Sequence, residues 1–183
     1  MNGPLPEPGD FACVSVGGPG GALIGLGERL AGAGFSAYEH AFVYVGGMLV
    51  VEAEPHGARL RKLGAFEAHG QVTLWSTGAI DLTDAERAKI CTAARFRVGI
   101  GYSALDYLAI GLHHAGIPAP GLRRFIASGH RLTCAQLIDD CYADAGVRLF
   151  DDGRWAGYVM PSDLAELIER RPRWGLPRPG KRP

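Results

Sequence analysis

The chain has 183 residues, of which 47% are hydrophobic, and this is enough for one domain with a substantial buried core. Nineteen basic and nineteen acidic residues give a net charge of zero, so the overall charge gives no reason to expect binding to nucleic acid or to an anionic membrane. No stretch approaches the roughly 20 apolar residues that a helix needs to cross a bilayer, so we expect no membrane span.

Residues 1–8 do not resemble a signal peptide, because they contain neither a basic start nor a long apolar run. Without an export signal we expect a cytoplasmic protein with reduced thiols, at Cys13, Cys91, Cys134 and Cys141. At the other end, residues 170–183 carry six basic residues, four prolines and no acid. We interpret them as a flexible tail that serves either as a solubilising end or as an arm for a partner.

The first predicted element is a short strand at residues 11–16, which follows the turn signal Pro8-Gly9-Asp10. The glycine-rich residues 17–21 come next and suggest a phosphate-binding loop. That interpretation fails, because no Gly-Lys-Ser/Thr follows and the G-x-G-x-x-G spacing breaks at Leu30. We expect a short helix at 22–30 and a loop at 32–39 instead.

Two apolar runs, residues 40–45 and 48–53, surround Gly46-Gly47 and predict a β-hairpin. Both runs are apolar on both faces, so they should lie inside a sheet rather than at its edge.

The register of this hairpin decides whether His40 and Glu52 meet. A three-residue loop of Val45, Gly46 and Gly47 would pair Tyr44 with Met48 and place His40 directly opposite Glu52. A two-residue turn at Gly46-Gly47 would shift the pairing by one and put the two side chains on opposite faces. We predict the first register.

Residues 59–66 and 71–76 suggest one or two further strands. Thr83 and Glu86 have the spacing of a capping box that opens a helix from 84 to 97. An irregular connection is expected at 119–129, and three more helices are predicted, at 103–115, at 134–145 and from near Ser162. Strands that cluster early and helices that cluster late are typical of the α+β class.

Cys134 stands where the helix predicted at 134–145 begins. Thr133 and Gln136 have the capping-box spacing, in which the Thr side chain accepts from the N3 amide and the Gln side chain reaches back. Cys134 would then be the first helical residue. Unpaired amides and the helix dipole favour a thiolate there, with a pKa below the usual value of about 8.5. The position therefore predicts a nucleophile.

These segments together resemble the permuted papain-like amidases of the NlpC-type cysteine peptidase superfamily. The resemblance is carried by Pro8-Gly9-Asp10, by His40-Ala-Phe-Val-Tyr-Val-Gly46 with Val51-Glu52-Ala53 beyond the turn, and by Thr133-Cys134-Ala-Gln-Leu-Ile, with weaker support from Gly99-Ile-Gly-Tyr102 and Pro161-Ser-Asp-Leu164. In that branch the His strand precedes the Cys helix, and the polar third residue follows the His by twelve positions. The resemblance covers residues 8 to about 168.

The resemblance implies a papain-like antiparallel sheet packed against helices, forming one hydrolase domain at 1–169 ahead of the tail at 170–183. It also implies that Cys134 attacks a carbonyl, His40 moves the proton and Glu52 orients the imidazole. The Cys134 amide is a natural oxyanion donor. Tyr102 resembles a family tyrosine, and Tyr142 resembles an aromatic residue that is frequent on the Cys helix of the family. Both are candidates for an oxyanion or substrate contact. The expected substrate is a small acyl or peptide-like molecule, and no cofactor is expected.

Other interpretations stay open at this point. Cys134 and His40 could be core residues, as Cys13, Cys91 and Cys141 most simply are. A metal site drawn from His40, Glu52, His56 and Cys134 is the rival use of these groups, but no HxxxH or CxxC spacing supports it, so we expect no metal. The same residues would also serve an acyltransferase, and the fold could be a non-catalytic binding module. Oligomeric state is open.

Overall fold

The computed structural model describes residues 5–15, 37–54, 56–67, 73–102, 131–153 and 159–170. The side chains of Tyr102 and Arg131 lie outside that description. The helices predicted at 22–30 and 103–115, the connection at 119–129 and all of the tail except Arg170 also lie outside it.

The described residues form an α+β fold, as predicted, built on a five-stranded sheet with the order β4-β3-β2-β1-β5 and antiparallel neighbours. The strands are β1 (Phe11–Val14), β2 (His40–Gly46), β3 (Leu49–Glu54), β4 (Gly57–Lys62) and β5 (Thr73–Trp75). The two strands of the hairpin lie inside the sheet, which confirms the prediction from their apolar faces. β1 also lies inside, and β4 and β5 form the edges.

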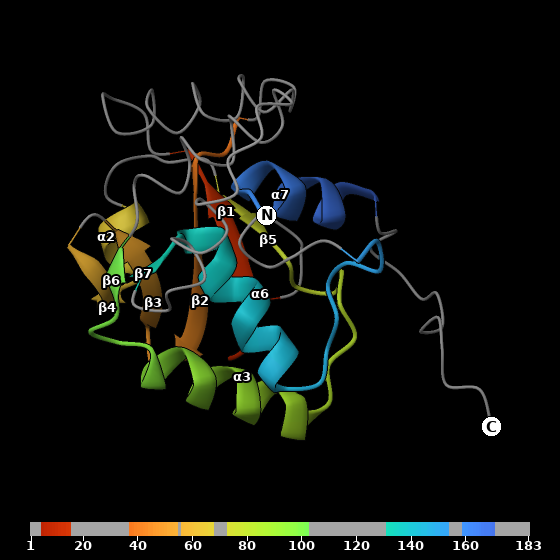
Figure 1. The fold of residues 1–183 in the computed structure, drawn as a ribbon, viewed down its shortest axis with the longest axis horizontal. Coiled ribbons are helices and arrows are strands. Elements are labelled where there is room, and N and C mark those ends of the chain that lie inside the picture. The colour runs from red at the N-terminus through yellow and green to blue at the C-terminus, as the bar shows by residue number, and fades with distance from the viewer. Residues whose placement is uncertain are drawn as a thin grey trace, which may run out of the picture.

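Three helices pack on one face of this sheet or at its end (Figure 1): α3 (Asp84–Phe96), α6 (Cys134–Asp144) and α7 (Pro161–Arg170). α6 lies against β2 and β3, α3 packs on α6, and α7 contacts β1 and β5. A two-stranded parallel ladder, β6 (Gly101–Tyr102) with β7 (Arg131–Leu132), leads into α6 and was not predicted. Within the described residues, no helix has both the length and the apolar character needed to cross a membrane.

The helix boundaries follow from their caps. The Thr83 side chain accepts from the Glu86 amide while Glu86 reaches back to the Thr83 amide at 2.7 Å, so the predicted capping box of α3 is confirmed. At the start of α6 the Thr133 side chain accepts from the Gln136 amide, and Gly146 follows the end of this helix in the left-handed conformation (φ 84°). Both helices therefore start and stop within a residue of their predicted bounds.

Apolar side chains form two clusters, one on each face of the sheet. The larger lies between the sheet and the helices and includes Val43, Val51 and Leu137. The smaller, on the opposite face, is made of residues that alternate with those of the first along the strands, namely Ala12, Val14, Phe42 and Val50 with Leu63 and Phe66.

One predicted strand is partly wrong. β4 ends at Lys62, and residues 64–66 belong to the short helix α2 (Gly64–Glu67) rather than to a strand. Leu63 and Phe66, three residues apart, are both buried in the smaller cluster. That spacing brings two side chains to one side of a helical turn, whereas in a strand they would point to opposite faces.

The β2–β3 hairpin pairs in a different register from the predicted one. Phe42 stands opposite Glu52, so His40 is not the direct partner of Glu52. The pairing has shifted by two residues. Because side chains alternate with period two, a shift by two keeps His40 and Glu52 on the same face of the sheet.

The turn of this hairpin explains the shift. Gly46 pairs with Leu49 around a two-residue turn at Gly47 and Met48, and Val45 is an extra residue that forms a bulge. Without the bulge, continuing from the Gly46–Leu49 pair would place Glu52 opposite Val43. Its side chain would then lie on the same face as Val43, which is the face opposite to that of His40. The bulge at Val45 is therefore what brings the two side chains to one face.

Met48 takes an unfavourable conformation in this turn. Gly47 has φ 63° and Met48 has φ 59°, as a type I′ turn requires at both central positions. Replacing Met48 by Gly should therefore raise the free energy of unfolding by about 0.5 kcal/mol, since the left-handed strain is only partly offset by the added flexibility of the unfolded chain. The Met48 side chain is mostly exposed, so little burial is lost.

Gly47→Ala is the matched control and should lower the free energy of unfolding by about 1 kcal/mol. A Cβ at Gly47 would meet nothing within 4 Å, so any loss comes from the backbone conformation alone. Urea denaturation measures both variants. A destabilised Met48→Gly chain would contradict the assignment of strain to Met48.

Candidate active site

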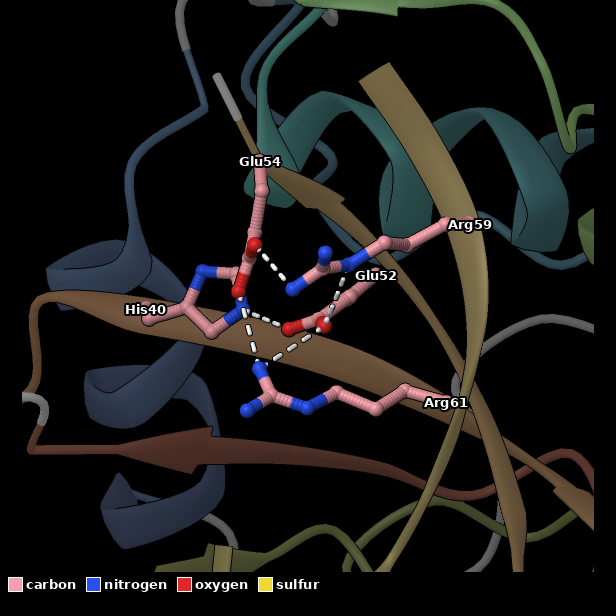
Figure 2. A network of polar contacts seen from close by, with 5 residues as sticks. All are labelled: His40, Glu52, Glu54, Arg59 and Arg61. Carbon is pink, nitrogen blue, oxygen red and sulfur yellow. Dashed lines mark hydrogen bonds and ion pairs between the residues drawn. The ribbon is translucent and has the colours of Figure 1, made fainter. Parts of the chain in front are cut away.

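His40 and Glu52 form a buried pair at the start of β2. His40 Nε2 lies 2.8 Å from Glu52 Oε2, and the side chains are 8% and 0% exposed. His40 is the first residue of β2 and Glu52 lies on the neighbouring strand β3 (Figure 2). The two side chains meet, as the sequence predicts, but by a diagonal contact between strands rather than by direct pairing.

Cys134 is the first residue of α6, as predicted, and is fully buried. The Thr133 hydroxyl accepts from the Gln136 amide at 3.2 Å, and the Thr133 carbonyl accepts from Leu137. The second half of the predicted capping box does not form, because Gln136 Oε1 is buried with no hydrogen-bond partner. The cap that fixes the helix start at Cys134 is therefore provided by Thr133 alone.

Cys134 and His40 interact through their side chains. Burial acts to lower the pKa of His40, but hydrogen bonds to Cys134 and Glu52 and the negative charge of both outweigh it and raise the pKa to about 10. The structure therefore connects the three predicted site residues in one chain of contacts, Cys134 to His40 to Glu52. At neutral pH the imidazole in this arrangement is protonated.

Two arginines on β4, which the sequence motifs do not identify, complete the environment of Glu52. Glu52 Oε1 lies 3.3 Å from Arg59 Nε and 3.2 Å from Arg61 Nη1. Burial acts to raise the pKa of Glu52, but the hydrogen bond and charge of His40, together with Arg61, hold it below its ordinary value. The signal was present in the sequence, because Arg59 and Arg61 alternate along a predicted strand and so share a face.

Glu54 lies on the same face as Glu52 and is engaged by the same arginines. Arg61 Nη1 lies 3.0 Å from Glu54 Oε1, and Arg59 Nη2 contacts Glu54 Oε2. The Glu54 side chain is 24% exposed, whereas that of Glu52 is fully buried. The buried carboxylate, Glu52, is the one that contacts His40.

A metal ion does not fit this cluster. His40, Glu52 and Glu54 bring their possible ligand atoms within 4.8 Å of one another. However, His40, Arg59 and Arg61 together contact all four carboxylate oxygens of Glu52 and Glu54. A cation would have to displace two guanidinium groups, which already neutralise both carboxylates. Of the two other predicted candidates, His56 is exposed and Cys134 is buried at the start of α6.

The two predicted tyrosines fall in different places. Tyr142 is fully buried, its hydroxyl donates to the Gly9 carbonyl at 2.7 Å, and its ring packs edge-on against Phe11. Eight residues along a helix is about 12 Å, so this occupied hydroxyl does not reach a ligand at Cys134. The predicted substrate contact of Tyr142 therefore finds no support, and the residue holds α6 to the N-terminal turn.

Tyr102 is described only by its backbone. It pairs with Leu132 in the β6–β7 ladder, and Leu132 precedes Cys134 by two residues. Its predicted role stays a prediction.

The three remaining cysteines differ from Cys134. All four are reduced cysteines. Burial raises the pKa of Cys141 to about 12, and burial also raises the pKa of Cys91. Cys13 is fully buried in β1. Burial of the thiols disfavours the thiolate at Cys91 and Cys141, so neither has the environment of a nucleophile.

No protein-family model matches this chain, and a search of curated proteins finds no match.

The contacts of His40 predict a pH dependence of stability. The pKa of His40 is raised from 6.5 to about 10, so the protonated ring contributes stability that is complete below about pH 6.5 and is lost as pH rises through about 10. The difference in free energy of unfolding between the wild type and His40→Gln should therefore shrink between these pH values. Urea denaturation across that range measures it, and NMR of the His40 ring should show a midpoint near 10. A midpoint near 6.5 with a constant difference would contradict the contacts.

Tyr142→Phe separates a structural role from a substrate contact. Loss of the hydrogen bond to Gly9 should lower the free energy of unfolding by about 1 kcal/mol. The rate at which iodoacetamide alkylates Cys134 should not change, because the hydroxyl lies two helical turns from the thiol. A changed alkylation rate with unchanged stability would contradict the structural role and support a role of Tyr142 at the candidate site.

Proposed function

We propose that this chain is a cysteine hydrolase that cleaves an amide, peptide-like or related acyl bond through a thioacyl-enzyme, on a permuted papain-like fold of the NlpC type. The observation that carries the proposal is the contact chain from Cys134 through His40 to Glu52. It joins a thiol at a helix start to an imidazole, and the imidazole to a buried carboxylate. This is the constellation that activates a cysteine nucleophile.

The first half of the reaction uses a thiolate at Cys134 and an imidazolium at His40. The sulfur attacks the carbonyl carbon of the substrate and forms a tetrahedral intermediate. His40 then gives its proton to the leaving amine or alcohol as the carbon–nitrogen or carbon–oxygen bond breaks, and a thioester remains on Cys134.

The second half returns the enzyme to its starting state. Neutral His40 takes a proton from water, and the resulting hydroxide attacks the thioester carbonyl. The carbon–sulfur bond breaks, the carboxylic acid leaves, and the thiolate and imidazolium pair is restored. Water supplies the oxygen and hydrogen that the acid gains, and it replaces the proton that His40 gave to the leaving group.

The surroundings of the three residues suit these steps. Glu52 engages Nε2 of His40, so Nδ1 is the ring nitrogen left for Cys134. α6 begins at Cys134, so in the proposed reaction the helix amides and the positive end of the dipole stabilise the carbonyl oxygen that gains charge. Four reduced cysteines also suit a reducing compartment, and we include a cytoplasmic location in the proposal.

Access to the sulfur is part of the mechanism. Cys134 is fully buried and His40 is 7% exposed, so the site has to open before a substrate can bind. Burial also excludes water from the thiolate and imidazolium pair, which strengthens their attraction while the site is closed.

Alkylation of Cys134 by iodoacetamide tests the proposal, because a neutral reagent reports the thiolate without knowledge of the substrate. In the wild type the rate should stay high at pH values well below 8.5, where an ordinary thiol loses reactivity. In His40→Ala the rate at pH 6 should fall on the order of a hundredfold, since the imidazolium that stabilises the thiolate is lost. Mass spectrometry of the modified peptide assigns the reaction to Cys134.

Cys141→Ala is the matched control on the same helix and should leave the profile unchanged, because the Cys141 thiol is buried with a raised pKa. A wild-type profile with a midpoint near 8.5, indifferent to His40→Ala, would contradict the nucleophile and favour a binding module. Hydrolysis of an activated ester such as p-nitrophenyl acetate should be lost in Cys134→Ser. Comparing its products with and without an added amine separates hydrolysis from acyl transfer.

A further inference from the structure

We propose that Arg59 and Arg61 are positioning residues, which hold one oxygen of the Glu52 carboxylate so that the other is directed at His40. The inference rests on the proposed function for its catalytic meaning. Its geometry does not, because every contact that carries it lies between residues of β2, β3, β4 and α2. Figure 2 shows the contacts among His40, Glu52, Arg59 and Arg61.

The two oxygens of Glu52 have separate partners. Oε1 faces Arg59 Nε at 3.3 Å and Arg61 Nη1 at 3.2 Å, while Oε2 faces His40 Nε2 at 2.8 Å. Rotation of the carboxylate would break all three contacts of a Glu52 side chain that is not exposed to water. The arginines therefore fix the direction in which Oε2 points, and with it the orientation of the imidazole.

The arginines also decide which of two carboxylates contacts His40. Continuing the β2–β3 register by two residues places Glu54, not Glu52, opposite His40. Both oxygens of Glu54 are engaged, Oε1 by Arg61 and Oε2 by Arg59. Glu54 is thereby held by the guanidinium groups, and Oε2 of Glu52 is the oxygen left for the imidazole.

Phe66 fixes Arg61 and His40 relative to each other. The Arg61 guanidinium lies 4.9 Å from the centre of the Phe66 ring, and the His40 ring stacks on Phe66 at 6.3 Å with an interplanar angle of 21°. Phe66 itself is buried in the smaller apolar cluster. One aromatic ring thus supports both the base and the arginine, and cation–π attraction adds to the packing.

A double-mutant cycle tests whether Arg61 acts through Glu52. Arg61→Gln should slow alkylation of Cys134 at pH 7 on the order of tenfold, because the imidazole loses its orientation. In the Glu52→Gln background the same change should alter the rate by less than about twofold, since no carboxylate remains to be positioned. Arg61→Lys should fall between the wild type and Arg61→Gln, because it keeps the charge but loses the planar fork.

NMR of the His40 Nε2–H proton is the second measurement, and it does not depend on catalysis. The hydrogen bond to a buried carboxylate should give a downfield resonance that exchanges slowly with water in the wild type. Arg61→Gln and Arg59→Gln should each broaden this resonance and speed its exchange on the order of tenfold. The double variant Arg59→Gln/Arg61→Gln should show the larger effect. If it does not fold, the two single variants still give this measurement.

Arg87→Gln is the matched control. Arg87 lies on α3 and forms a comparable ion pair, at 2.8 Å, with buried Asp10, the residue before β1. This variant should lose stability without changing the His40 resonance, and its effect on alkylation should be the same with and without Glu52→Gln.

The outcomes distinguish the two proposals. Equal effects of Arg61→Gln in both backgrounds, with an unchanged His40 resonance, would overturn the positioning role while Cys134 stays activated. A wild type in which His40→Ala leaves alkylation unchanged would overturn the proposed function. In that case the resonance alone would decide whether the arginines orient Glu52.

Discussion

The arrangement of this site depends on one buried charge, the carboxylate of Glu52. A carboxylate with no exposure to water is costly unless cations and hydrogen-bond donors surround it, and three of them do: His40 from β2 and Arg59 and Arg61 from β4. Three adjacent strands must therefore pair in a fixed register before the charge is compensated. The same requirement that stabilises the sheet here places a protonated imidazole next to the start of α6.

The site is assembled from both faces of the sheet. Glu52 and its arginines lie on the face of the smaller apolar cluster, whereas α6 packs on the other face. His40 can contact both because it is the first residue of its strand, at the end of the sheet. A histidine in the middle of β2 would be confined to one face by the neighbouring strands.

The sequence contains most of the information about which residues meet and little about how. Helix starts are predictable because a cap is local, and Cys134 was placed correctly on that ground alone. The register of β2 on β3 is not determined by the residues of the turn alone. It depends on a bulge at Val45, which the Gly46-Gly47 turn signal does not predict. Arg59 and Arg61 alternate visibly in the sequence, but assigning them to Glu52 requires the pairing of β4 on β3. α2 was missed because four residues are too few for a helical period to show.

The raised pKa of His40 depends on the charges of Cys134 and Glu52 before a substrate reacts, and it changes during the proposed reaction. Cys134 and Glu52 both raise it to about 10, which is too high for a base at neutral pH. When the sulfur bonds to a carbonyl carbon, its negative charge passes to the substrate and then to the leaving group. One of the two contributions that raise the pKa of His40 is then gone, while Glu52 stays fixed by its arginines. The proton is released at the step that needs an acid, and the neutral imidazole that remains is the base that the water step requires.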